Sequence, residues 1–142
     1  MLAENLHRFI QTPLFAVQSL YDTWSLYYIL GVRCQQNDSL KNCNGAELAY
    51  IEDYHRNTSR VLEEIAAKPQ HGYWAPSCLN HGYTWTHYYT ESYTIPMKSK
   101  NTIDSTAFPW SQKQPGNHRY MDRGNWPENQ PCSNYVAMNI RS

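Results

Sequence analysis

The longest regular pattern of apolar and polar residues lies between residues 46 and 68, where apolar positions recur every three or four residues. Such spacing predicts an amphipathic helix with one buried face. Glu and Arg occupy its other faces, and Pro69 ends it. The predicted buried face consists of Leu48, Ile51, His55, Thr58, Leu62 and Ile65.

Two shorter apolar runs predict strands. Residues 13–20 (PLFAVQSL) are apolar on both sides, as in the buried strands of parallel sheets. Asp22 stands where this strand ends, and a helix is predicted from Thr23 to Gly31. Residues 72–78 (GYWAPSC) form the second candidate strand, and His81 comes just past its end. Strands that alternate with helices predict an α/β fold with short parallel strands.

The two ends of the chain carry weaker patterns. At the N-terminus, residues 2–11 (LAENLHRFIQ) predict a short amphipathic helix, which Pro13 stops; its apolar side consists of Leu2, Leu6, Phe9 and Ile10. After Pro96 the chain contains four of its eight prolines and little periodicity. A short helix over residues 102–110 is the one element predicted there. Residues 111–142 are predicted to be an irregular but ordered tail, because their Trp and Tyr content exceeds that of disordered segments.

Composition excludes some partners. Twelve basic and twelve acidic residues cancel, with a pI near 7.0, so no net charge attracts nucleic acid or an anionic membrane. No apolar run is long enough to span a membrane. The chain is 14% aromatic, although its mean hydropathy of −0.73 is polar. Half-exposed aromatic rings suit a sugar-binding surface, and they suit an aromatic core almost as well.

The four cysteines and two glycosylation sequons favour a secreted or lumenal protein. The sequons begin at Asn37 and Asn57. A cytosolic protein with four free thiols is the alternative. Spacing leaves three disulfide pairings open, among Cys34, Cys43, Cys78 and Cys132. The N-terminus lacks the pattern of a signal peptide, so we expect the chain to be the mature or C-terminal part of a longer precursor.

Asp22 and His81 are candidate catalytic residues, because each follows a predicted strand and one crossover helix separates them. In α/β hydrolases the acid and the histidine of a Ser-His-Asp triad occupy such positions in this order. A helix N-cap is the competing interpretation of Asp22. For His81 a zinc site with Cys78 and His87 competes, as does an ordinary loop position. His55 is expected in the core, whereas surface or loop positions are predicted for His7, His71, His87 and His118.

The nucleophile is absent from the sequence pattern. A nucleophile elbow requires G-x-S-x-G or a close variant, because the serine must occupy a strained turn. None of the eleven serines has glycines at that spacing. The chain is therefore predicted to be inactive in triad hydrolysis by itself.

Two segments resemble the pectin acetylesterase and Notum family. PLFAVQSLYDTWSLYYIL is similar to the segment that carries the family's triad aspartate, and GYWAPSCLNHGYT is similar to its Ser-Cys-x-x-His segment. CQQNDSLKNCNGAEL between them resembles the family's cysteine-bounded loop before a long helix. The resemblance covers residues 12–110 and is specific, because the order, spacing and flanking residues of the segments agree.

The resemblance implies the roles of several residues. Asp22 would be the triad acid and His81 the general base. Disulfides would join Cys34 to Cys43 and Cys78 to Cys132. The family's serine lies well upstream of its aspartate, and that half is absent here. Residues 1–142 would then be a single partial domain, the C-terminal half of an α/β-hydrolase-like fold, with a disulfide-pinned tail.

The implied function is that of a secreted carboxylesterase that hydrolyses an ester, such as an O-acetyl group on a polysaccharide. Neither a metal nor another cofactor is expected, and the missing N-terminal half is the expected protein partner. Four aromatic residues near the catalytic pair could line an acyl or sugar pocket, although core packing explains them equally well: Trp24, Trp74, Tyr83 and Trp85. The main alternative is a non-catalytic family member that serves as an extracellular structural or glycan-binding protein, and a lectin-like module without hydrolase ancestry is the third.

Overall fold

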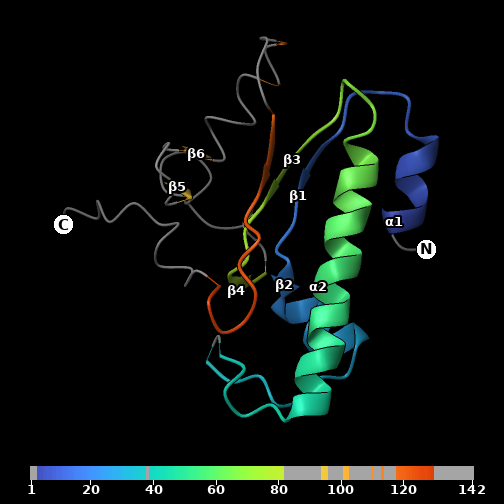
Figure 1. The fold of residues 1–142 in the computed structure, drawn as a ribbon. Helices are drawn as coiled ribbons and strands as arrows, with labels where there is room; N and C mark the ends of the chain where they lie inside the picture. The colour runs from blue at the N-terminus through green and yellow to red at the C-terminus, as the bar shows by residue number, and fades with distance from the viewer. Residues whose placement is uncertain are drawn as a thin grey trace, which may run out of the picture.

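The computed structural model describes residues 3–37, 39–81, 94–95, 101–102, 110, 113 and 118–129. The described chain contains helices and short strands (Figure 1), and the strands pair in parallel except for the antiparallel pair of β5 with β6. The helices are α1 (Ala3–Leu6), η1 (His7–Phe9), η2 (Ser25–Ile29) and α2 (Gly45–Ile65). The strands are β1 (Phe15–Val17), β2 (Tyr21–Asp22), β3 (Gly72–Ala75), β4 (Leu79–Asn80), β5 (Thr94–Ile95), β6 (Asn101–Thr102) and β7 (Arg119–Met121).

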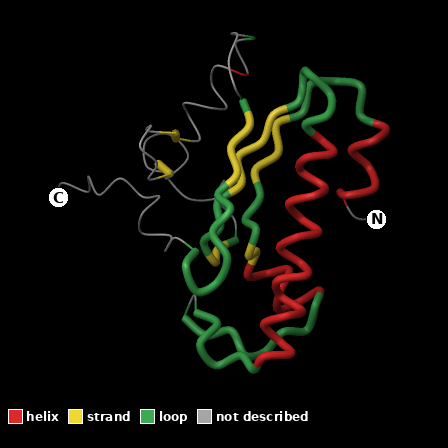
Figure 2. The backbone as a smooth tube through the Cα atoms, in the orientation of Figure 1, coloured by secondary structure: helices red, strands yellow, loops and turns green. Residues whose placement is uncertain are grey.

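The main sheet has the order β1-β3-β7, and all its strand pairs are parallel. Helix α2 runs along one face of this sheet, with the strands together on one side of it (Figure 2). Beyond the sheet the chain continues into a second parallel pair, β2 with β4. The backbone N–H of Leu20 donates to Pro76 O between the two pairs, so one ladder continues into the other. These parallel pairs confirm the predicted α/β architecture.

The long helix α2 begins with a capping box. The Asn44 side chain accepts hydrogen bonds from the backbone N–H groups of Ala46 and Glu47, and the Glu47 carboxylate accepts from the Asn44 N–H. The buried positions of α2 all belong to the predicted face: Ile51, His55, Leu62 and Ile65. The helix ends at Ile65, three residues before the predicted end. The Lys68 ammonium instead donates to the carbonyl groups of Arg8 and Ile10.

The N-terminal helix lies where the sequence predicted it, but its predicted apolar face is wrong. Phe9 is 79% exposed and Leu6 is also exposed, whereas His7 is buried. The short helix is positioned by polar contacts to the C-terminal turn of α2. His7 Nε2 lies 3.9 Å from a Glu64 carboxylate oxygen, and Arg8 donates to the same oxygen at 3.2 Å. These contacts orient His7 inward, so its predicted surface position is also wrong.

The sequence predicts a surface or loop position for His71, and the residue lies in the loop before β3 but is buried. Only 1% of it is exposed, and its Nδ1 accepts a hydrogen bond from the backbone N–H of Leu14 at 3.1 Å. The bond joins the start of β1 to the start of β3. Nδ1 can accept this hydrogen bond only when it carries no proton of its own. Burial, and then the charge of Lys68, lowers the pKa of His71 below the ordinary value of 6.5.

We expect the stability of the fold to decrease in acid because of His71. A lowered pKa means that the folded state binds fewer protons than the unfolded state, so this contribution is complete above about pH 6.5 and is lost as the pH falls below it. His71→Asn retains an acceptor but cannot be protonated, and it should flatten this dependence. Urea unfolding at about pH 7.5 and pH 5.5 measures the difference. The matched control is His118→Asn, which changes another histidine in the same way. If the stability of His71→Asn changed with pH as much as that of wild type, the assignment to His71 would be wrong.

The C-terminal segment contains a strand that the sequence did not predict. Strand β7 lies inside the region predicted to be irregular and forms the third strand of the main sheet. Three residues are too few to show a period-two pattern, and pairing with β3 defines the strand. A Cβ added to Gly72 would lie 2.7 Å from His118 O, so glycine permits this close approach. Of the helix predicted over 102–110, Thr102 lies in β6 and most of the remainder is outside the described residues.

The predicted disulfide between Cys34 and Cys43 is present, with an S–S distance of 1.99 Å. Cys78 is also disulfide-bonded, whereas its predicted partner, Cys132, lies outside the described residues. Asn37 and Asn57 are both exposed, as glycan acceptors would be. Within the described part of the chain, no helix has the length and hydropathy needed to cross a bilayer.

Candidate active site

Strands β2 and β4 bring Asp22 and His81 together. Asp22 is opposite Asn80 in the parallel register, and His81 is the next residue along the chain. Both side chains therefore lie at the carboxyl ends of neighbouring strands. His81 Nδ1 is 2.7 Å from Asp22 Oδ2, a hydrogen-bond distance. The sequence made these two residues one candidate pair among several alternatives, and the structure places their side chains in contact.

Asp22 makes two hydrogen bonds through different oxygens. Oδ2 faces His81, while Oδ1 accepts from the backbone N–H of Ser25 at 2.7 Å. The second bond caps the helical turn that begins after β2. From the sequence, a helix N-cap and a partner of His81 are alternative roles for Asp22, but in the structure its carboxylate makes both contacts. Because the Asp22 side chain is only 7% exposed, the helix N–H and the imidazole replace water as its partners.

The His81 ring has one nitrogen turned to the carboxylate. An ionised Asp22 can only accept a hydrogen bond, so Nδ1 carries the proton and Nε2 is the basic nitrogen of the neutral ring. The backbone N–H of His81 donates to Asn80 Oδ1 at 2.7 Å. The ring also stacks on Trp24, with centroids 5.8 Å apart. At 37% side-chain exposure, His81 is accessible from solvent while Asp22 is not.

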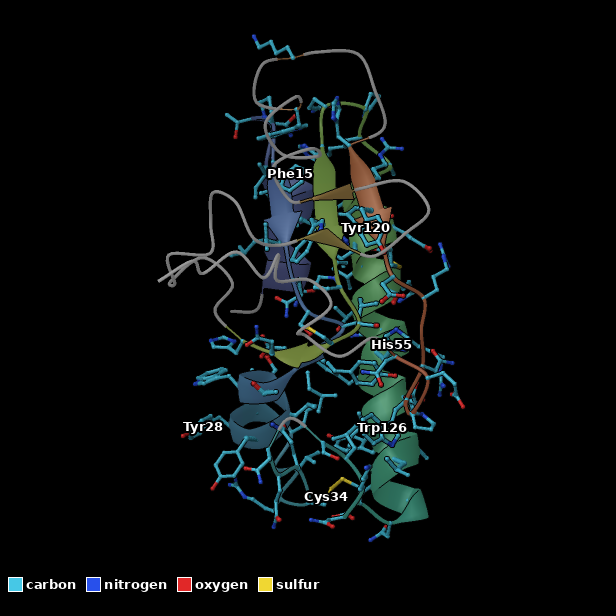
Figure 3. The ribbon with its side chains drawn as sticks, turned by 90° about the vertical axis from the view of Figure 1, so that its left-hand side faces the viewer. Phe15, Tyr28, Cys34, His55, Tyr120 and Trp126 are labelled. Carbon is cyan, nitrogen blue, oxygen red and sulfur yellow. A yellow bond between two sulfur atoms is a disulfide. The ribbon has the colours of Figure 1, made fainter. Side chains whose placement is uncertain are left out.

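A network of side chains supports the strand that carries Asp22. The hydroxyl of fully buried Tyr21 donates to Glu52 Oε1 on α2 at 2.5 Å, and it accepts from the backbone N–H of Trp126 at 2.9 Å. The Tyr21 ring stacks on His55, whose Nδ1 is 3.3 Å from Glu52 Oε2. Figure 3 shows Trp126 beside α2, the helix that carries His55. Burial raises the pKa of Tyr21 well above its ordinary range, so the hydroxyl remains a neutral donor.

The sequence predicts a hydrogen-bonded His55 in the core, which the structure confirms, but it does not predict the rest of this network. Glu52 and His55 are three residues apart on α2, and a histidine on the apolar face of an amphipathic helix signals a buried hydrogen-bond partner nearby. No pattern indicated that Tyr21 and Trp126, which are far apart in sequence, would meet there. Since Tyr21 directly precedes Asp22, the network fixes the end of β2 against α2.

Neither buried serine near the site is free to act as a nucleophile. Ser19 Oγ donates to Cys78 O at 2.6 Å, and Ser77 Oγ donates to Asp122 Oδ2 at 2.6 Å. Both residues have almost no exposed surface. Their hydrogen bonds join the segment between β1 and β2 to the segment before β4, and that segment to the residue after β7. These serines are therefore structural.

Among the described residues, few metal ligands lie near Asp22 and His81. The zinc set suggested by the sequence requires a thiolate at Cys78, but Cys78 is disulfide-bonded. His87 lies outside the described residues. Elsewhere among the described residues, Cys34, Cys43 and Glu47 gather within 4.8 Å, but the two sulfurs form a disulfide.

The four predicted pocket aromatics have different outcomes. Trp24 is 46% exposed and contacts His81. Trp74, in contrast, is fully buried in β3, so it has no surface to offer a ligand and packing explains it. Tyr73 and Ala75 belong to the core cluster beside α2, whereas Trp74 lies between them in β3, points to the opposite face of the sheet and is fully buried there. Tyr83 and Trp85 lie outside the described residues.

The chain is thus an α/β protein with an aspartate–histidine pair at the carboxyl ends of adjacent parallel strands. The family model for Pectinacetylesterase matches residues 1–133, so the chain belongs to the pectinacetylesterase family. This family implies an esterase that acts on an acetylated polysaccharide. No curated protein and no solved structure matches the chain.

Proposed function

We propose that this chain supplies the acid and the base of a Ser-His-Asp esterase that removes acetyl groups from a polysaccharide. The observation that carries the proposal is the 2.7 Å contact between His81 Nδ1 and Asp22 Oδ2 at adjacent strand ends. A triad requires a buried carboxylate beside an accessible imidazole, and this pair has that asymmetry. Membership of the pectinacetylesterase family supports the ester substrate.

In this mechanism His81 Nε2 removes the proton of the serine as the serine attacks the acetyl carbonyl. Asp22 holds the proton on Nδ1 and stabilises the imidazolium that forms. His81 then returns the proton to the sugar oxygen as that oxygen leaves, giving an acetyl-enzyme. Water then attacks the acetyl-enzyme while His81 takes its proton, and His81 returns that proton to the serine oxygen as acetate is released. The Ser25 N–H restricts rotation of Asp22, so the carboxylate is oriented before substrate binds.

The serine and the oxyanion hole would come from a further segment, as in an α/β-hydrolase-like sheet that continues past β1. Among the described strands, β1 lies at the edge of the main sheet. A groove of about 500 Å³ lies beside it, between β1, η2 and α2. Its apolar lining includes Val17, Ile29, Val61 and Leu62. An open edge beside an apolar groove is suited to receive another strand and helix. Residues 1–142 would then be one part of a single hydrolase domain.

A secreted location fits this assignment. Disulfide bonds persist in oxidising compartments, and three of the four cysteines are disulfide-bonded within the described residues. The sequon residues Asn37 and Asn57 are exposed and accessible to a glycosyltransferase. We therefore expect glycosylation at these asparagines.

Acetate release from an acetylated polysaccharide tests the proposed function. The 142-residue chain alone should release acetate no faster than buffer, because its sequence contains no nucleophile elbow. Joined to the segment that precedes it in the gene, it should catalyse turnover, and a serine in that segment should be labelled by an active-site phosphonate. Equal activity of the chain alone would contradict the external nucleophile, and an inactive joined protein would contradict the esterase function.

A further inference from the structure

A row of aromatic rings leads away from His81 along η2. Trp24 stacks on His81, and Tyr28 contacts Trp24 with ring centroids 5.4 Å apart. Tyr27 meets Tyr28 edge to face at 4.8 Å. We call Trp24, Tyr27 and Tyr28, with Arg33 at the far end, the aromatic ridge. Figure 3 shows β4 directly beside the short helix η2, with Tyr28 pointing outward from that helix.

The ridge is open to solvent. Trp24, Tyr27 and Tyr28 are between 42% and 66% exposed. Aromatic side chains bury large areas when they pack, so three adjacent exposed rings represent a substantial unused contact surface. The five-residue helix η2 has π-type hydrogen bonding, a geometry that occurs frequently at functional sites. Gly31, with φ of 71°, then turns the chain so that Arg33 returns to Tyr27.

The ridge ends in a positive charge. The Arg33 guanidinium carbon lies 3.7 Å from the centroid of the Tyr27 ring, and Nη1 donates to Tyr27 O at 2.9 Å. These contacts hold the side chain over the ring and leave other N–H groups of the guanidinium exposed. Between Thr23 and Arg33 the sequence contains no other charged residue. The ridge therefore combines apolar ring faces with one cation.

We propose that the aromatic ridge binds the backbone of an acidic polysaccharide and delivers its acetyl esters to His81. Sugar rings have flat C–H faces, whose partial positive charge suits the negative face of an aromatic ring. A carboxylate on a neighbouring sugar would pair with the Arg33 guanidinium. The ridge is continuous with His81, so a chain bound on it places substituents beside the basic nitrogen. This inference rests on the proposed esterase function and adds the residues that hold the substrate.

Binding of an ester-free ligand tests the ridge separately from hydrolysis. Calorimetry of the 142-residue chain should detect a tetragalacturonate, and binding of a neutral galactotetraose should be weaker. Tyr28→Ala should weaken tetragalacturonate binding roughly tenfold, the scale of one aromatic contact, whereas Tyr28→Phe should retain it. Arg33→Gln should remove the preference for the acidic ligand. Tyr50→Ala is the matched control, because Tyr50 is an exposed tyrosine on α2 outside the ridge.

Three outcomes would overturn the inference. If tetragalacturonate binding were undetectable, the proposed ligand would be wrong. If Tyr28→Ala and Tyr50→Ala weakened binding equally, the proposed site would be wrong. If Tyr28→Ala left the affinity of the complete enzyme for tetragalacturonate unchanged, the ridge would be covered by protein in that enzyme and could not bind the ligand. Because the probe carries no ester, normal binding beside absent acetate release supports the ridge and refutes only the esterase function.

Discussion

Replacing Asp22 by asparagine in the complete enzyme is expected to lower kcat by roughly 10³- to 10⁴-fold with little change in KM. Asparagine has the same shape, and its Oδ1 can still accept from the Ser25 N–H. Its amide would then face His81 Nδ1 with donors, and a donor cannot accept the Nδ1 proton. The proton would move to Nε2, where the base must be free. Acetate release under saturating substrate measures kcat.

The matched control for Asp22→Asn is Asp53→Asn, because Asp53 is an exposed aspartate on α2 paired with Arg56. It should leave kcat unchanged. His81→Ala should lose at least as much activity as Asp22→Asn, and the double variant should be no worse than His81→Ala, since the two residues act as one unit. Additive losses would show that Asp22 acts independently of His81. Full activity in Asp22→Asn would remove the carboxylate from the mechanism.

Tyr21→Phe is expected to lower the free energy of unfolding by about 2 to 3 kcal/mol. The change removes the hydroxyl that donates to Glu52 and accepts from the Trp126 N–H. Glu52 loses a charge-assisted hydrogen bond in a partly buried position, and the Trp126 N–H loses its acceptor. The phenyl ring retains the stacking on His55, so the loss reports the hydrogen bonds. Urea unfolding followed by circular dichroism gives the difference from the midpoint and slope.

Two further variants separate this network from general effects of removing a hydroxyl. Tyr50→Phe changes an exposed tyrosine on α2, the helix that carries Glu52, and should alter the free energy of unfolding by less than about 0.5 kcal/mol. Glu52→Gln keeps an acceptor for the Tyr21 hydroxyl while removing the charge, so it should be less damaging than Tyr21→Phe. If Tyr21→Phe were as stable as wild type, the network would not hold β2 against α2.

Several elements followed from local patterns in the sequence. The α2 face is an uninterrupted helical repeat, and its buried positions are those that the repeat predicted. Asp22 and His81 stand at strand ends because apolar runs stop there, and parallel pairing of these runs places their ends at the same edge. The resemblance to the pectin acetylesterases added the Cys34–Cys43 disulfide, which the structure contains. The catalytic roles of Asp22 and His81 remain predictions.

Other features depend on contacts between distant segments. Strand β7 has three residues and exists through its pairing with β3, so no local repeat could indicate it. His7 and His71 are buried because Glu64 and the Leu14 N–H provide polar partners, and hydropathy alone assigns histidine to the surface. Trp74 and Trp24 were both predicted to lie near the catalytic pair, but Trp74 in β3 is fully buried, whereas Trp24 in the helical turn after β2 is exposed.

The sequence by itself therefore determined the long helix α2, the strand segments that lead to Asp22 and His81, and these two candidate catalytic side chains, because periodicity and strand ends are local properties of the chain. The tertiary structure decided which partners these side chains have. It gave Asp22 both the helix N–H and the imidazole, attached Tyr21 to α2, and aligned the aromatic ridge with His81. Hydrogen bonds and ring contacts between residues far apart in sequence depend on how elements pack, and packing leaves no periodic signal in any one segment.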